Sequence, residues 1–405
     1  MHRTKTPLLL LGLLPLLAAC ATPDAGTQPD AGSQTPAETA PHGYIAGAQE
    51  NSEPQTGLLT LDRETGEAQL LSLLTEETVD AGTFGPVSTV HQDGRYTFIT
   101  TDDGMDVFDT GAWTVAHGDH DHYYSAEPGV VGTLELEDPG AVAGNGSVIA
   151  VFSDSEGYAS LYLREDLDAG RIVETGRITT SPHRGVAVPF EDFFLVSVAG
   201  ADGIPDGVEV RNLDDQTVLP KARCPGLSAH AQTRAGVVFS CTDGALLITE
   251  DDGAFAAEHI PYPADASAEP ADTLNHRPGS NELAGPAGDT GVWHLDVSER
   301  VWTFLETPVP VVAASAVGGD TQRVLAVSTD GSLLSLNPES GAVLNQVPLL
   351  EHVEDSVPQL RIDTSRAYVS DPNGSTVYEI DYADGLRVAR SFDVPSADFL
   401  LETGL

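Results

Sequence analysis

Residues 117 to 124 read HGDHDHYY, the densest group of potential metal ligands in the sequence. The segment holds three of the protein's twelve histidines and two interleaved aspartates: His117, Asp119, His120, Asp121 and His122. Neutral imidazole and carboxylate are zinc ligands, and a carboxylate beside an imidazole also fixes the orientation of the ring. Neither a helix nor a strand aligns all three histidines, so we expect a loop that wraps them together. A solvated polar loop is the alternative. Calcium is disfavoured because histidine is not its ligand.

Four further histidines recur at a similar place in the sequence, shortly before a glycine-containing turn. They are His91 (13 residues before Gly104), His230 (14 before Gly244), His276 (15 before Gly291) and His183, in SPHRGVAV, if the long turn AGADGIPDG explains its distance from Gly207. His352 is a weaker fifth candidate. The alternative is that each makes an ordinary hydrogen bond in a strand turn.

The glycines after these histidines mark an internal repeat: a β-rich run, a polar turn with glycine, then an alternating run that often ends in Asp. The eight markers, spaced about 45 residues apart on average, are Gly57, Gly104, Gly157, Gly207, Gly244, Gly291, Gly331 and Gly374. That spacing is typical of a four-stranded propeller blade, and the alternation indicates antiparallel hairpins with one buried face on each strand. We therefore predict an all-β fold, an eight-bladed β-propeller from residue 43 to residue 405, with seven blades as the alternative.

Such a fold would position the histidines. The strand before each hairpin lies nearest the propeller axis, so imidazoles from different blades can line a central channel and meet at one ion. HGDHDHYY falls between the second and third hairpins, as an insertion expected at the channel mouth. The first copy begins at Tyr44 without an inner strand, and the C-terminal run SADFLLETG is expected to complete that blade.

The charge of the chain limits its partners. With 62 acidic and 19 basic side chains, the formal net charge is -43, which excludes electrostatic attraction to nucleic acid or an anionic membrane. Cations, or proteins with basic faces, are favoured instead. Adaptation to salt or to solubility would explain the same charge.

The N-terminus predicts export. Residues 1–20 combine a basic start, an apolar run and LAAC, which is typical of a lipoprotein signal peptide with Cys20 as the lipidated residue. Residues 21–42 read as a disordered spacer. We expect a protein lipid-anchored at the outer face of the cytoplasmic membrane, on the cell surface or in the periplasm. Cys224 and Cys241 flank the fifth hairpin and are predicted to form a disulfide there, with metal ligation as the alternative.

Together these motifs resemble the AztD-type zinc metallochaperones. The resemblance rests on HGDHDHYY, SPHRG, CPGLSAH followed by SCTDG, and LNHRPG, and it covers nearly the whole chain from residue 43. It implies a β-propeller that binds zinc and passes it directly to the solute-binding protein of a zinc ABC importer. It also implies zinc ligands among His117, Asp119, His120, His122, His91, His183, His230 and His276. One departure from the family is Cys20, which predicts a tethered lipoprotein; a freely diffusing periplasmic form would need a different signal.

The resulting prediction is a monomeric zinc chaperone that is not an enzyme and contacts the membrane only through its lipid anchor. Two other classes stay open: a metal-dependent propeller hydrolase or lactonase, and a metal-free propeller that binds proteins. The chain contains neither a GxSxG nucleophile elbow nor a glycine-rich phosphate loop. Since histidine binds metal only when neutral, zinc affinity should fall as the pH drops below about 6.5.

Overall fold

Short β-strands make up nearly all of the regular structure. A computed structural model describes residues 44–118, 120–319, 322–351, 353, 357–373 and 375–405, within a unit that runs from His42 to Leu405. The predicted signal peptide, Cys20 and the spacer lie outside the described residues, as do Asp119, His352 and Gly374. No helix within the described residues is long and apolar enough to cross a membrane.

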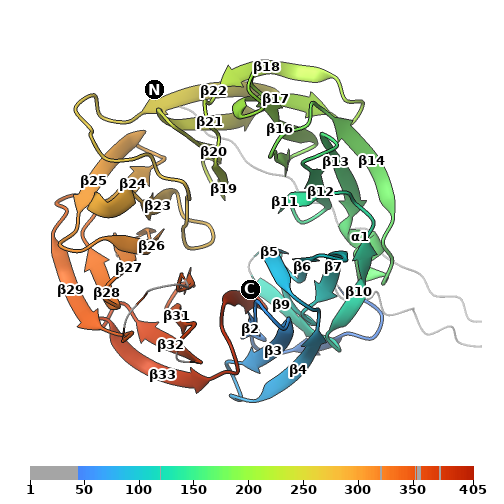
Figure 1. Ribbon diagram of the computed structural model, residues 1–405. Helices are drawn as coiled ribbons and strands as arrows, with labels where there is room; N and C mark the ends of the chain where they lie inside the picture. The colour runs from blue at the N-terminus through green and yellow to red at the C-terminus, as the bar shows by residue number, and fades with distance from the viewer. Residues whose placement is uncertain (1–43, 119, 320–321, 352, 354–356, 374) are drawn as a thin grey trace, which may run out of the picture. The chain divides into compact units, whose positions relative to one another are not determined.

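Eight of the nine sheets in the described chain follow one another around a ring (Figure 1). The first four contain β34 (Phe399–Thr403), β2 (Gly57–Leu61), β3 (Glu67–Ser72) and β4 (Thr78–Thr83); β5 (Val87–Asp93), β6 (Tyr96–Thr101), β7 (Gly104–Asp109) and β10 (Gly129–Leu134); β11 (Pro139–Gly144), β12 (Val148–Ser153), β13 (Tyr158–Leu163) and β14 (Glu174–Thr179); β15 (Ala187–Phe190), β16 (Phe193–Ala199), β17 (Pro205–Asn212) and β18 (Thr217–Arg223). The next four contain β19 (Ala229–Thr233), β20 (Gly236–Cys241), β21 (Gly244–Asp251) and β22 (Ala254–Pro261); β23 (Glu282–Pro286), β24 (Gly291–Asp296) and β25 (Val301–Glu306); β26 (Val311–Ala316), β27 (Val324–Ser328), β28 (Ser332–Leu336) and β29 (Val343–Pro348); β30 (Leu360–Ile362), β31 (Ala367–Asp371), β32 (Thr376–Asp381) and β33 (Arg387–Asp393).

The ninth sheet lies outside the repeat and consists of β1 (Gln49–Asn51), β9 (His120–Ser125) and β8 (Ala112–His117). Within the described residues, the helical elements α1 (Arg164–Asp168) and η1 (Gly288–Thr290) are short. The prediction of an all-β protein built from repeated four-stranded antiparallel sheets is confirmed.

Burial is highest in the second strands, counted from the middle of the ring, and is lower in the innermost strands β5 and β19 and in the outer strands. The second strands β2, β20 and β31 are buried at every position, whereas the outer strands β4 and β29 are mostly exposed. The expectation of one buried face on each strand is therefore wrong for the second strands. Each second strand has a neighbouring sheet packed on both of its faces. Apolar residues therefore occur along it without alternating with polar ones.

The first predicted repeat places its hairpin one strand too early in the sequence. β1 pairs with β9, and the first hairpin of the ring is β2–β3, which turns at Gly66 rather than at Gly57. Gly66 has φ of 71°, and a Cβ there would lie 2.0 Å from the carbonyl oxygen of Gly85. The C-terminal strand β34 pairs antiparallel with β2 in the same sheet.

Glu402 on β34 carries a buried carboxyl group. Its side chain is 9% exposed, and Oε1 has no hydrogen-bond partner among the described residues. Burial and the neighbouring Asp363 carboxylate raise the pKa of Glu402 to about 8, against the opposing effect of Arg361. Folding therefore favours the protonated form of this group.

This burial predicts a stability loss in alkaline solution. The unfolded chain releases the Glu402 proton near the ordinary pKa of 4.5, but the folded protein keeps it until about pH 8. Stability from this group is thus complete below pH 4.5 and falls as the pH rises to about 8, by up to about 1.4 kcal/mol per unit. Glu402→Gln should flatten this slope in urea unfolding at pH 5 and pH 8, whereas exposed Glu67→Gln should not. Equal slopes in wild type and Glu402→Gln would contradict the assignment.

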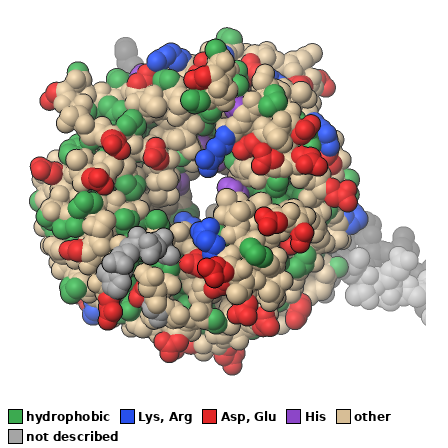
Figure 2. All heavy atoms as spheres, viewed as in Figure 1, with side chains coloured by type: hydrophobic (Ala, Val, Ile, Leu, Met, Phe, Trp, Pro, Cys, Tyr) green, Lys and Arg blue, Asp and Glu red, His purple; other side chains and the backbone are tan. Residues whose placement is uncertain are grey.

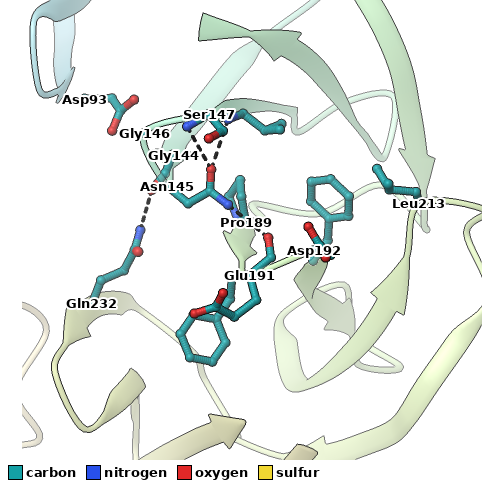
Figure 3. A pocket seen from close by; sticks show the side chains of 13 residues that line it. Asp93, Gly144, Asn145, Gly146, Ser147, Pro189, Glu191, Asp192, Leu213 and Gln232 are labelled. Atoms are coloured by element: carbon teal, nitrogen blue, oxygen red, sulfur yellow. Dashed lines mark hydrogen bonds between the residues drawn. The ribbon is translucent and has the colours of Figure 1, made fainter. Parts of the chain in front are cut away.

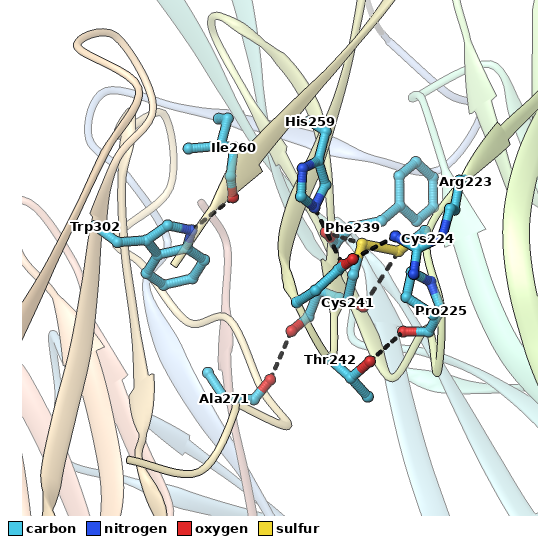
Figure 4. Close-up of a disulfide and its surroundings, with 12 residues drawn as sticks. Arg223, Cys224, Pro225, Phe239, Cys241, Thr242, His259, Ile260, Ala271 and Trp302 are labelled. Atoms are coloured by element: carbon cyan, nitrogen blue, oxygen red, sulfur yellow. Dashed lines mark hydrogen bonds and ion pairs between the residues drawn. A yellow bond between two sulfur atoms is a disulfide. The ribbon is translucent and has the colours of Figure 1, made fainter. Parts of the chain in front are cut away.

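A disulfide joins Cys224 to Cys241, as the sequence predicts, and both residues are buried (Figure 4). It links the segment that leads into β19 to the end of β20, with which β19 pairs. Because β19 carries His230, the bridge helps to fix the position of that histidine.

Replacing both cysteines with alanine is expected to lower the free energy of unfolding by about 3 kcal/mol, the chain-entropy effect of opening a loop of this size. The loop spans 17 residues. Urea unfolding with and without reductant checks this, since the reduced wild type should approach the variant. A reductant that leaves the wild-type midpoint unchanged would argue against a stabilising bridge.

Candidate metal sites

The histidine-rich segment forms a β-hairpin rather than a wrapping loop. β8 and β9 are inserted between β7 and β10, and their register pairs His117 with His120 and Val115 with His122. The turn begins at Gly118, which has φ of 67°. Residues opposite each other in an antiparallel pair lie on the same face, as do alternate residues of one strand. The backbone thus places positions 117, 120 and 122 on one face, which corrects the expectation of a loop. The tight turn that begins at Gly118 achieves this alignment.

Two imidazoles and a carboxylate meet on this hairpin. The ring centroids of His120 and His122 are 4.9 Å apart. Nδ1 of His122 lies 2.7 Å from Oε1 of Glu50 on β1. Asp119 and the side chain of His117 lie outside the described structure.

The base of the hairpin is held by aromatic and ionic contacts. Trp113 and Tyr124 stack with ring centroids 5.4 Å apart, and the Arg95 guanidinium lies 3.8 Å from the Trp113 ring centre. Arg95 also binds the Asp109 carboxylate, and Thr110 donates its backbone N–H to the Arg95 carbonyl. These contacts attach the hairpin to the β5–β6 turn, close to the strand that carries His91.

A second pair of imidazoles, His91 on β5 and His230 on β19, faces the middle of the ring. Two sheets separate β5 from β19 along the ring, and both strands lie at its inner edge (Figure 1), where the charge of His91 acts on His230. Figure 2 shows an opening there with histidine and basic side chains in its wall. Burial, and then the charge of His91, lower the pKa of His230 to about 4, and burial lowers the pKa of His91. Both rings are therefore neutral at neutral pH and have a lone pair for a metal.

These pKa directions change one expectation from the sequence. An ordinary histidine binds protons below about pH 6.5, but protonation of His230 requires a pH near 4. Protons therefore compete for His230 only well below the usual range, and burial shifts the competition at His91 in the same direction.

A depression of about 680 Å³ lies beside the channel pair (Figure 3). Its lining includes Asp93 and Gln232, each two residues beyond a channel histidine, and the carboxylates of Glu191 and Asp192. Gln232 donates through Nε2 to the Gly144 carbonyl at 2.8 Å. Arg164 approaches the Asp93 carboxylate at 3.7 Å, so the negative charge of the depression comes from Glu191 and Asp192, and this charge favours cations.

The other two predicted channel histidines have hydrogen-bond partners close by. Nδ1 of His183 donates to the Ser181 carbonyl at 2.6 Å, and its Nε2 accepts from the Ser197 hydroxyl at 2.8 Å. Zinc would have to displace Ser197 to reach Nε2. His276 donates through Nδ1 to the Arg277 carbonyl at 2.8 Å, and burial lowers its pKa.

The structure groups the candidate ligands in two places, the hairpin and the channel pair. Within the described residues, no three His, Cys, Asp or Glu side chains are arranged to hold a metal ion. Convergence of all four channel histidines on one ion is therefore not seen. A site at either place needs further donors, from water or from residues outside the described part.

Sequence reasoning missed three residues of these clusters: Glu50, Asp93 and Gln232. Asp93 and Gln232 each lie two residues after a channel histidine. Alternate residues of a strand share a face, so this spacing could have indicated them from the sequence. Glu50 lies 72 residues before His122, and its place depends on the pairing of β1 with β9. Nothing local in the sequence indicates that pairing.

The ring of antiparallel sheets defines a β-propeller-like protein with histidines on its inner strands. The chain is similar to the zinc chaperone AztD of Citrobacter koseri, with 24% identity over 311 residues, 73% of this chain and 74% of that protein. The crystal structure of Citrobacter koseri AztD has a TM-score of 0.75 at 22% identity and covers 87% of this chain and 98% of that one. Apo AztD from the same organism has a TM-score of 0.73 at 21% identity, covering 86% and 97%. No family model matches the chain. The resemblance to AztD is confirmed, and at these identities the structures establish a shared fold.

Proposed function

We propose that this protein is an exported zinc chaperone that captures zinc and passes it to the solute-binding protein of a zinc ABC importer. The observation that carries the proposal is the histidine hairpin, whose register places positions 117, 120 and 122 on one face. His91 and His230, on two inner strands of the ring, are its second support. The similarity to a protein named zinc chaperone AztD supports the choice of metal.

Two groups of ligands suit a carrier better than one closed site. A closed tetrahedral site releases zinc slowly, whereas exchange of one ligand at a time avoids a bare, desolvated ion. The exposed hairpin can collect zinc, and the half-buried channel pair can hold it as neutral imidazole. The Glu191 and Asp192 carboxylates of the depression beside the channel raise the local concentration of cations.

The architecture in this proposal is an eight-bladed propeller, with β34 completing the blade of β2, β3 and β4. The pairing of β34 with β2 and the sequence of eight sheets in Figure 1 support it. A lipid on Cys20 and a spacer over residues 21–42 would tether the domain outside the cytoplasmic membrane and let it reach its partner.

Direct transfer tests this function. Zinc-loaded protein is mixed with the zinc-free solute-binding protein of a zinc importer, in the presence of a chelator that traps free zinc. We expect zinc to reach the acceptor faster than the chelator removes it from the chaperone alone. Transfer no faster than spontaneous release would overturn the handover.

A further inference from the structure

β1 brings a carboxylate to the face of the hairpin that carries the histidines. It pairs antiparallel with β9, so that Glu50 lies opposite Tyr124. Tyr124 and His122 are alternate residues of β9 and share a face. By register, Glu50 therefore belongs to the same face as the histidine positions, and its Oε1 reaches Nδ1 of His122 at 2.7 Å.

β1 does not need Glu50 to stay in place. Asn51 donates through Nδ2 to the Ser125 hydroxyl at 3.0 Å, and three backbone positions of β1 are in register with β9. Glu50 is about 42% exposed, and an exposed ion pair contributes little to stability. The contact between Glu50 and His122 thus has little structural value of its own.

The same contact has a defined effect on metal binding. A carboxylate accepts a hydrogen bond only from the protonated ring nitrogen, so Glu50 selects the tautomer of His122 with hydrogen on Nδ1. The lone pair is then on Nε2, the nitrogen directed away from Glu50. Carboxylates placed in this way orient metal-binding histidines, and their loss typically weakens metal binding by about 10–100-fold.

We propose that Glu50 is a positioning residue of the zinc site on the hairpin, holding His122 so that Nε2 faces the metal. This role rests on the proposed zinc function. It makes the short strand β1, which lies outside the ring repeat, part of the metal site.

The test uses the full-length protein with His91 and His230 replaced by alanine, so that only hairpin zinc is counted. Zinc affinity is measured by chelator competition in this background and after Glu50→Ala, Glu50→Gln or Gln49→Ala. Gln49 is the matched control because it is an exposed neighbour on the same strand. We expect Glu50→Ala to weaken zinc about 10–100-fold, Glu50→Gln to weaken it less because its amide oxygen still accepts, and Gln49→Ala to have no effect.

Two spectroscopic readouts separate positioning from other roles. In zinc-free protein, ¹⁵N shifts should show His122 with hydrogen on Nδ1, and a mixed tautomer after Glu50→Ala. Cobalt spectra of the Glu50→Ala variant should keep the coordination number of the parent. A lower coordination number would make Glu50 a direct ligand, and affinity equal to that of Gln49→Ala would remove its role; either result overturns the proposal.

A further variant distinguishes an error about Glu50 from an error about zinc binding by the hairpin. In the same background, changing His117, His120 and His122 to alanine should abolish the remaining zinc. If that variant loses zinc while Glu50→Ala does not, only the role of Glu50 is wrong. If it keeps zinc, the hairpin is not a zinc site and the proposed function loses one of its two supports.

Discussion

Replacing His117, His120 and His122 together with alanine is expected to remove hairpin zinc, with a loss of affinity of more than about 100-fold. Loss of a residue that only orients a ligand already costs about 10–100-fold, and this change deletes the imidazoles themselves. The fold should persist, because the hairpin is held at its base by Arg95, Trp113 and Tyr124 rather than by its histidines. Chelator competition and thermal unfolding measure the two effects.

The matched control for the hairpin variant is His259→Ala. His259 lies on the outer strand β22, where it contacts the Asp243 carboxylate at 3.1 Å (Figure 4). Its loss should leave zinc binding unchanged. A hairpin variant that binds as much zinc as this control would rule out the hairpin as a zinc site.

Replacing His91 and His230 with alanine is expected to remove the second zinc ion, with a comparable loss of affinity. The two imidazoles come from inner strands with two sheets between them along the ring, and this change deletes both. Both pKa values are lowered by burial, which keeps the rings neutral and able to bind metal. Isothermal titration with zinc at neutral pH should show one class of site fewer than in wild type.

Single variants show whether the two channel histidines act on one ion. His91→Ala and His230→Ala should each weaken the same zinc, and the double variant should lose little more than either one. Additive losses from two independent ions would contradict a shared site across the channel.

The sequence predicts the repeated sheets well because each repeat carries a local signal. Gly104, Gly244 and Gly291 each begin a strand directly after a turn, as the marker pattern requires. The first repeat is misplaced because Gly57 also begins a strand, β2, but the segment before it does not form a hairpin with β2. β2 pairs with β3 and with the C-terminal strand β34. A strand-initial glycine and a turn glycine look alike in sequence, and the difference depends on β34, more than 300 residues away.

The candidate sites were only partly predictable for a similar reason. The spacing of His117, His120 and His122 fits no single helix or strand, but it fits a two-residue hairpin, which places positions 117 and 120 opposite each other. The placement of His91 and His230 at the inner edge of the ring, and the contact of Glu50 with His122, depend on tertiary structure. The hydrogen bonds of His183 with Ser181 and Ser197 could not be read from SPHRG alone.

Zinc stoichiometry decides whether the hairpin and the channel histidines each hold an ion. The full-length protein is stripped with a chelator and equilibrated with buffered zinc, and its metal content is measured for the wild type, the hairpin variant, the channel variant and the two combined. We expect two zinc ions in the wild type, one in each variant and none in the combination. A combined variant that retains stoichiometric zinc, or a wild type that binds none, would contradict it.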